Sequence, residues 1–251
     1  MKSILKGSLA ILLIFFTLIF TLSMNNSIYS NKTIKNFEAD NKNIELSYSL
    51  GRIYINNNWS EAKNAGICTG EGTYSNPYVI EDLVINGGET DRGIYIANSS
   101  DFFKINNCTI FDCSVGITLS NVNNSQLINN KIYNNSFGIG LIFSYKNNIT
   151  LNNIFNSFEG LKLYYCYHNN FSGNRIHNNF IGLSLTNCYN NNIIQNNISQ
   201  NFRLFIDSPI TGANTTSGIG IEIINSSCNL FSENAVNQNY DAGIILSCSN
   251  E

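Results

Sequence analysis

Aliphatic residues occur along most of the chain in short groups separated by polar residues, and the groups repeat with a nearly constant period. The clearest marker of the period is a glycine followed by isoleucine or leucine, at Gly93, Gly116, Gly138, Gly160, Gly182, Gly220 and Gly243. One interval, between Gly182 and Gly220, is longer than the others and holds one period with extra residues at 204–219. A period this regular predicts a solenoid, in which each unit covers the open face of its neighbour.

Each period holds three apolar groups, which predict three short strands per turn. The first group is a pair spaced i, i+2 after the glycine, a spacing that puts both side chains on one face of a strand. These pairs are Ile94/Ile96, Ile117/Leu119, Ile139/Leu141, Leu161/Leu163, Leu183/Leu185, Ile221/Ile223 and Ile244/Leu246. The second group is Ile105, Ile128, Leu151, Phe171, Ile194 and Phe231, and the third is Ile110, Ile132, Ile154, Ile176, Ile198 and Val236.

No run inside the repeats is long enough for a helix, so the pattern predicts an all-β, three-faced parallel β-helix over residues 52–251. The extra residues at 204–219 are then a loop inserted between two coils. A leucine-rich repeat has a similar period, but its Leu-x-x-Leu-x-Leu spine is missing from this chain.

Asparagine is the most abundant residue, with 46 Asn beside 36 Ile. It tolerates left-handed backbone angles at corners, and its amide can bond to the equivalent amide one coil away. We therefore expect two structural stacks of asparagine rather than ligand contacts. The expected stacks are Asn98, Asn121, Asn187, Asn225 and Asn107, Asn130, Asn174, Asn234.

Residues 1–30 predict an export signal or a membrane anchor. Lys2 and Lys6 precede a hydrophobic helix predicted at residues 7–23, and no clean small-x-small cleavage site follows. Removal of the segment as a signal peptide and retention as an anchor are both open. Residues 31–51 form a polar spacer. The chain beyond it is expected outside the cell, secreted or anchored to the outer face of the membrane by residues 7–23.

Charge excludes one class of partner. Lys and Arg total 14 against 17 Asp and Glu, and charged residues are only 12% of the chain. No basic surface is therefore available to hold nucleic acid.

The Gly-Ile-x-Leu…Asn-Asn…Asn-x-Ile cadence resembles the right-handed parallel β-helix repeat of NosD-like proteins, pectin-degrading enzymes and predicted archaeal surface proteins. Residues 72–85, GTYSNPYVIEDLVI, resemble the segment that such proteins place before their first full coil. The resemblance covers residues 52–251. It implies the fold, whereas activity depends on the site that each member builds on it.

The enzyme motifs of this fold class are missing. The chain lacks the Asn-Thr-Asp, Asp-Asp and Gly-His-Gly strings of polygalacturonase-like members and the Asp-Pro-His string of alginate epimerase-like members. The outward position between the first two apolar ladders reads Tyr95, Thr118, Gly140, Lys162, Ser184, Glu222 and Ile245. No two carboxylates are expected to stack there, so no catalytic residue is predicted.

The best remaining group is a ligand site made of Lys162 and Glu222, with Arg203 and Asp207 entering the insertion. The insertion at 204–219 would overhang this face and form a shallow cleft. The function predicted is a non-catalytic surface rod that binds a polysaccharide or a surface glycoprotein. The alternative is a divergent polysaccharide-processing enzyme, a lyase, hydrolase or epimerase. The last coil, with no cap after Gly243, predicts either end-to-end self-association or a truncated chain.

No cofactor or metal site is predicted. NosD-like proteins are described as copper-associated, but His168 and His177 lie at different corners without ligands at metal spacing, and Met24 is the one methionine after the start. Among the cysteines, Cys166 and Cys188 occupy the same position of successive repeats and are expected to stack, as a disulfide or as buried thiols. The sequons at Asn58 and Asn214 lie outside the ladders and are the expected glycosylation sites.

Overall fold

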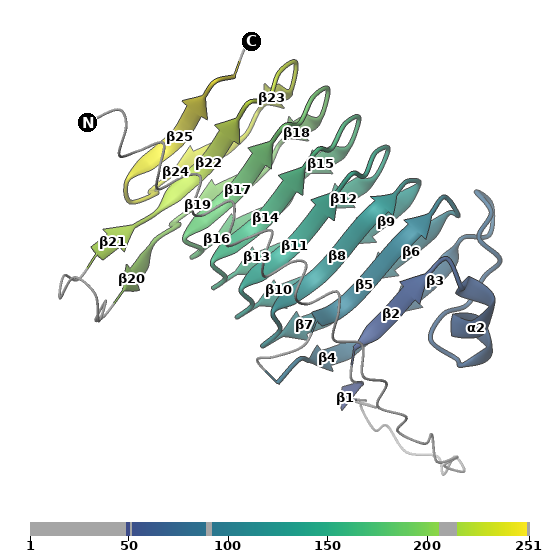
Figure 1. The fold of residues 1–251 in the computed structure, drawn as a ribbon. Coiled ribbons are helices and arrows are strands. Elements are labelled where there is room, and N and C mark those ends of the chain that lie inside the picture. Colours follow the sequence, from purple (N-terminus) through teal and green to yellow (C-terminus); the bar gives the residue numbers. More distant parts are fainter. Residues whose placement is uncertain (1–48, 51, 89–91, 206–214, 250–251) are drawn as a thin grey trace. The chain divides into compact units, whose positions relative to one another are not determined.

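The computed structural model describes residues 49–50, 52–88, 92–205 and 215–249, all within the compact unit Leu46–Glu251 (Figure 1). The predicted signal or anchor at 1–30 lies outside the described residues, as does most of the spacer at 31–51. In the part of the chain that is described, no helix is long and apolar enough to cross a membrane.

Three parallel sheets build the repeat unit (Figure 1). Sheet A contains β1 (Ser49–Leu50), β4 (Val84–Asn86), β7 (Thr109–Phe111), β10 (Lys131–Tyr133), β13 (Asn153–Phe155), β16 (Arg175–His177), β19 (Asn197–Ser199) and β24 (Ala235–Asn237). Sheet B contains β2 (Ile53–Asn56), β5 (Arg92–Ser99), β8 (Val115–Val122), β11 (Phe137–Ile142), β14 (Glu159–Tyr164), β17 (Ile181–Thr186), β22 (Ile219–Ile224) and β25 (Ala242–Ser247). Sheet C contains β3 (Tyr78–Glu81), β6 (Phe103–Asn106), β9 (Ser125–Ile128), β12 (Asn148–Thr150), β15 (Asn170–Ser172), β18 (Asn192–Ile194) and β23 (Leu230–Ser232).

Each coil runs through one strand of sheet B, one of sheet C and one of sheet A, which confirms the predicted parallel β-helix. Two elements depart from the repeat. The short helix α2 (Trp59–Asn64) follows β2, and its Trp59 stacks on Tyr78 with ring centroids 4.8 Å apart. The antiparallel hairpin of β20 (Arg203–Phe205) and β21 (Thr215–Ser217) lies at the predicted insertion, between β19 and β22.

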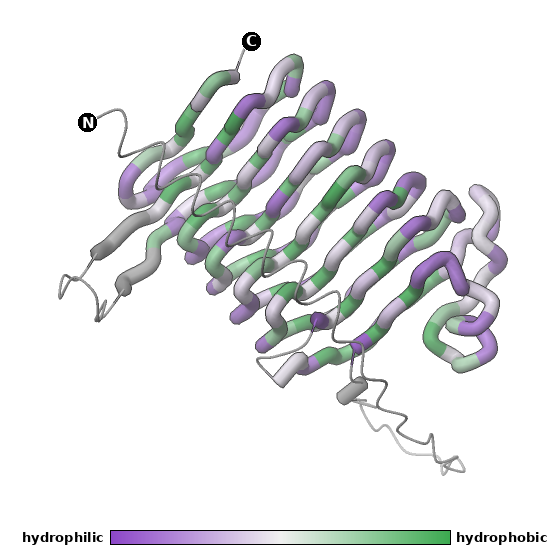
Figure 2. Tube along the Cα trace, viewed as in Figure 1, coloured by the Kyte–Doolittle hydropathy of each residue, from purple (hydrophilic) through white to green (hydrophobic). Residues whose placement is uncertain are grey.

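The core is a set of aliphatic ladders that run through the interior of the coils. Ile117, Ile139 and Leu161 are register partners in β8, β11 and β14, and all three are buried. Figure 2 shows hydrophobic and hydrophilic residues alternating along the coils. The first and third predicted apolar groups are confirmed by this register, including Ile132 and Ile154 in sheet A.

The second predicted group is wrong at three positions. In sheet C the inward residues are Leu127, Ile149 and Ile193, which replace the predicted Ile128, Leu151 and Ile194. Leu151 has a left-handed backbone, with φ 58°, and its side chain is 59% exposed. It occupies the turn between sheets C and A, so its apolar side chain lies outside the core although its sequence spacing fits a ladder.

The repeated glycine is required by the spacing between coils. A Cβ on Gly160 would lie 2.7 Å from the carbonyl oxygen of Gly182 and 2.8 Å from Asn179 Nδ2. Any side chain here would push two coils apart. Gly140, which follows the repeated Gly138 and Ile139, has open space around its Cβ position.

Asparagine amides connect neighbouring coils inside the corners. The backbone N–H and the Nδ2 of Asn152 both donate to Asn174 Oδ1 at 3.0 Å, and Asn174 Nδ2 donates to the Ile149 carbonyl at 2.8 Å. This buried ladder contains Asn130, Asn152, Asn174, Asn196 and Asn234. The expected second stack is therefore right except for Asn107, which is one residue out of step. Cys108 occupies its ladder position, and the Cys108 N–H donates to Asn130 Oδ1.

The other expected stack lies on the outer surface. Asn121 Nδ2 donates to Asn98 Oδ1 at 2.9 Å, and Asn225 Nδ2 donates to Asn187 Oδ1. These residues have left-handed backbone angles, with φ 54° for Asn121 and 52° for Asn98. Both stacks are structural, as the sequence predicts.

Candidate functional site

One candidate site lies on the outer face of sheet B. Lys162, Ser184 and Glu222 are register partners in β14, β17 and β22. Lys162 Nζ lies 2.7 Å from Glu159 Oε1, and Ser184 Oγ donates to Glu159 Oε2 at 2.7 Å. The Lys162 ammonium also lies 5.1 Å from the centre of the Phe137 ring. We call Glu159, Lys162, Ser184 and Glu222 the acid–lysine cluster.

The two carboxylates of the acid–lysine cluster have different environments. Burial raises the pKa of Glu222, and the nearby Glu159 carboxylate raises it further, while Lys162 acts in the opposite direction. Glu159 is bonded to both Lys162 and Ser184, which fix the position of its carboxyl group. A carboxyl group with a raised pKa beside a second carboxyl group held by a lysine and a serine is an arrangement that can transfer a proton to a bound ligand.

The sequence pattern did not reveal Glu159. It precedes the repeated glycine, at a position paired with Phe137 and Ile181, on the same strand as Lys162. The outward row itself holds one carboxylate, Glu222, as expected, and Glu159 adds a second carboxylate to the cluster from outside that row. The sequence does place Glu159 three residues before Lys162. In a regular strand, residues three apart point to opposite faces, so this spacing alone does not predict that the two side chains meet.

The structure brings together only part of the predicted ligand group. Lys162 and Glu222 share the cluster, whereas Arg203 begins strand β20 of the hairpin. Asp207 lies outside the described residues. The predicted glycosylation acceptor Asn58 is half-buried, and its side chain bonds Glu61 Oε2 at 2.7 Å and the N–H of Asn56 at 2.9 Å. Asn214 also lies outside the described residues.

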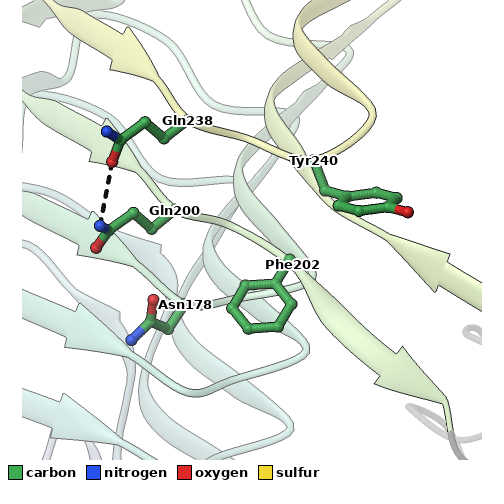
Figure 3. Close-up of a pocket in the computed structure, with 5 residues that line it drawn as sticks. All are labelled: Asn178, Gln200, Phe202, Gln238 and Tyr240. Atoms are coloured by element: carbon green, nitrogen blue, oxygen red, sulfur yellow. Dashed lines mark hydrogen bonds between the residues drawn. The ribbon is translucent and has the colours of Figure 1, made fainter.

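A second candidate site is a groove beside the hairpin, where the chain passes from sheet A to sheet B (Figure 3). The groove has a volume of about 450 Å³ and is lined by Asn178, Gln200, Phe202, Gln238 and Tyr240. Figure 3 shows the three amide side chains on one side and the two rings on the other. We call it the amide–aromatic groove.

The side chains of the amide–aromatic groove are open to solvent. The Phe202 side chain is 49% exposed and that of Tyr240 is 62% exposed. Gln200 Nε2 donates to Gln238 Oε1 at 3.1 Å, which holds two of the amides in line. Such a site offers donors, acceptors and apolar ring surface without a charge.

This groove was also missed by sequence reasoning, although a signal exists. Phe158, Phe180 and Phe202 recur at the same position of successive repeats, and Tyr240 takes the same place in the next coil. Aromatic residues at a turn have no role in building the core. A repeated exposed aromatic is therefore the observation that could have found the groove.

The histidines do not assemble a metal site. His177 Nε2 lies 3.1 Å from Asn153 Oδ1, and its ring stacks on Phe155 with centroids 5.1 Å apart. Burial lowers the pKa of His177, and Arg175 lowers it further. Within the described ranges, no three His, Cys, Asp or Glu residues lie close enough together to hold a metal ion.

Cys166 and Cys188 stack on adjacent coils as the spacing predicts, and both are buried free thiols in the structure. The Cys166 N–H donates to Cys188 Sγ at 3.4 Å, and burial raises the pKa of the Cys166 thiol. A thiol of this kind fills a small inward corner, the place that Ser144 and Ser226 take in neighbouring coils.

The three sheets and their coil-to-coil register define a parallel β-helix protein. A family described as "Periplasmic copper-binding protein (NosD)" matches residues 24–211. The match covers well over half of the chain, so the chain belongs to the NosD family. A periplasmic family agrees with the expected location of this chain outside the cytoplasm.

Several solved structures are similar to this chain. A tailspike enzymatic domain of bacteriophage CBA120 is 15% identical with a TM-score of 0.51, over 68% of this chain and 29% of its own. A mannuronan C-5 epimerase A-module from Azotobacter vinelandii is 18% identical with a TM-score of 0.49, over 68% and 52%. Pectate lyase Pel9A is 13% identical with a TM-score of 0.49, over 73% and 64%. The chain thus spans less than two thirds of each, and no curated protein matches it.

The described residues do not fit the copper named in the family description. Both histidines and all seven cysteines of the chain lie in the described ranges, and five of these thiols are buried. His168 lies at a left-handed turn, whereas His177 is the last residue of strand β16 and not at a corner as expected. Within those ranges no three His, Cys, Asp or Glu residues are grouped closely enough to hold a metal ion.

Proposed function

We propose that this protein is an extracellular β-helix rod, secreted or tethered to the membrane by residues 7–23, that binds a polysaccharide or the glycan of a surface glycoprotein without cleaving it. The observation that supports this proposal is the amide–aromatic groove. Its five lining residues combine three amides with two exposed rings.

This combination matches the chemistry of sugars. Sugar hydroxyls both donate and accept hydrogen bonds, as do the amides of Gln200 and Gln238. The C–H faces of a sugar ring are apolar, and the exposed rings of Phe202 and Tyr240 offer matching apolar surface. Because none of the five side chains is charged, the groove favours neutral sugars over uronates.

The test is a glycan array probed with the full chain, followed by product analysis of each polysaccharide bound. Phe202→Ala and Tyr240→Ala should each weaken binding about tenfold, because each removes ring surface from the groove. Phe143→Ala is the matched control, since Phe143 is an aromatic residue 53% exposed at the corner between sheets B and C. Equal binding by wild type and both groove variants would refute the site. New chain ends or unsaturated sugars would refute the non-catalytic role.

The acid–lysine cluster supports a second candidate, a divergent polysaccharide-processing hydrolase, lyase or epimerase. Glu222, with its raised pKa, would donate a proton, and Glu159, held by Lys162 and Ser184, would be the second carboxyl group of the site. Under this alternative Glu159→Gln and Glu222→Gln should each abolish product formation while leaving glycan binding intact. Absence of product from the wild-type chain on every bound polysaccharide would exclude it.

A further inference from the structure

The amide–aromatic groove is one end of a longer row of amides. Asn134, Asn156, Asn178, Gln200 and Gln238 occupy the same place in five consecutive coils, directly after the strands of sheet A. All five have left-handed backbone angles, with φ of 54° or 55°. Strand register fixes their alignment, because Tyr133, Phe155, His177, Ser199 and Asn237, which precede them, are paired from coil to coil. We call these five residues the amide track.

Two rows of aromatic residues border the amide track, one along its first coils and one along its last coils. On sheet A, Phe111, Tyr133, Phe155 and His177 stack in a column with neighbouring centroids 5.1 Å apart. On the side of sheet B, Phe158 and Phe180 stack at 4.8 Å, and Phe202 and Tyr240 follow in the next two coils. In the sheet A column each ring stacks on the face of the next, so the ring faces are covered, whereas Phe202 and Tyr240 are open to solvent.

The amides of the track are available to a ligand. Asn134, Asn156, Gln200 and Gln238 are exposed, and Asn178 is half-buried. The side chains of Asn134 and Asn156 make no hydrogen bond to the described part of the chain. Left-handed turns in this fold need only a residue that tolerates the angle, and Asp112, Tyr165 and Cys228 also adopt it. Turn geometry alone therefore does not require five amides in a row.

We propose that the amide track binds an extended segment of a neutral, β-linked polysaccharide that lies along the rod axis, with one sugar unit per coil. This inference rests on the proposed function. The coils repeat every ~4.8 Å, close to the advance of one sugar unit in an extended polysaccharide. Each unit then meets an equivalent amide, with the sheet A column beside Asn134, Asn156 and Asn178 and the second aromatic row beside the amides from Asn156 to Gln238.

The track also predicts which part of the polymer is recognised. It is open along its length at Asn134 and Asn156, and each coil presents the same chemistry. A site of this kind binds the interior of a chain, and its affinity grows with the number of units engaged. A pocket limited to Phe202 and Tyr240 would instead saturate with one or two sugars.

The experiment is calorimetric titration of the full chain with di- to hexasaccharides of β-1,4-linked glucose, mannose, xylose and N-acetylglucosamine. For the best series, affinity should rise at least tenfold from disaccharide to hexasaccharide. Asn134→Ala and Asn156→Ala should each weaken hexasaccharide binding several-fold and leave disaccharide binding unchanged. Phe202→Ala should weaken both.

Asn190→Ala is the matched control, because Asn190 is exposed with φ 54° but lies at the corner between sheets B and C. It reports the cost of alanine in this backbone conformation, and thermal melting of all variants checks their folding. Equal affinity for all lengths, with Asn134→Ala and Asn156→Ala neutral, would overturn the track and leave the groove as proposed. Binding of no neutral series would overturn both.

Discussion

Asparagine occupies two kinds of corner position in each coil, and the backbone angle separates them. Asn174 lies in an inward ladder, is 1% exposed and bonds to the coils on both sides. Asn178 follows it in the same coil at an outward, left-handed position with φ 55°. The first kind satisfies buried backbone groups that would otherwise have no partner, and the second permits the turn.

Replacing an inward asparagine should therefore destabilise the rod much more than replacing an outward one. In Asn174→Ala, the N–H and Nδ2 of Asn152 lose their shared acceptor, and the Ile149 carbonyl loses a donor. We expect the free energy of unfolding to fall by about 2–3 kcal/mol. Chemical denaturation followed by circular dichroism measures this change.

The control for that prediction is Asn148→Ala, at an exposed asparagine on sheet C. Its unfolding free energy should stay within about 0.5 kcal/mol of wild type. If the two variants are equally stable, the ladder bonds contribute nothing net.

Sequence reasoning is least certain at the level of single residues. It predicts the inward stack that contains Asn130 and Asn174, but it includes Asn107 in place of Cys108. Adjacent corner residues differ only in backbone angle, and neither composition nor period reveals which one points inward. The assignment of Leu151 to the core is wrong for the same reason, because an aliphatic residue at a left-handed turn can have the sequence spacing of a core residue.

At the scale of the strand, parallel pairing predicts which outward residues meet. The row Lys162, Ser184 and Glu222 follows directly from the repeat and is confirmed by the register of sheet B. Glu159 joins this row from the position before the repeated glycine, so it could not be placed from a two-residue alternation. The raised pKa of Glu222 depends in part on Glu159, which the repeat pattern does not place beside it.

The ionised form of Glu222 should lower the stability of the folded chain. Burial and the Glu159 carboxylate raise the pKa of Glu222 above its value in the unfolded chain, so its ionisation at neutral pH opposes folding. Glu222→Gln should raise the melting temperature at pH 7. As the pH falls through the raised pKa toward about 4, the wild-type carboxyl becomes protonated and the difference should disappear.

Thermal melts of Glu222→Gln and wild type at pH 4, 5, 6 and 7 measure this dependence. Glu71→Gln, at an exposed glutamate, is the control and should show no such trend. A gain in stability for Glu222→Gln that is the same at every pH would contradict the assignment.

At the scale of the whole described unit, the repeat predicts the fold, and the insertion predicts where one coil is interrupted. The groove was not predicted, because it depends on residues 178, 200 and 238 standing side by side, and the last two are separated by the insertion. Register across β19 and β24 brings them together. The coil therefore continues as if the hairpin were absent.

Deletion of residues 203–218 tests this continuity. Phe202 would then join Ile219, as Phe180 joins Ile181 in the preceding coil. The Ile219 N–H already bonds the Phe180 carbonyl at 2.9 Å, as the Ile181 N–H bonds the Phe158 carbonyl. The carbonyl of Phe202 can replace that of Gly218 as the acceptor for the Asp241 N–H, a bond of 2.8 Å.

We therefore expect the deleted chain to fold with a melting temperature within a few degrees of wild type, because a surface loop adds little to stability. Glycan binding separates two roles of the hairpin. If the amide–aromatic groove is built by the coils, neutral oligosaccharides should still bind the deletion variant, and Phe202→Ala in that background should still weaken them. Loss of all binding from a folded deletion variant would instead place the ligand contacts in the hairpin and remove the groove as the site.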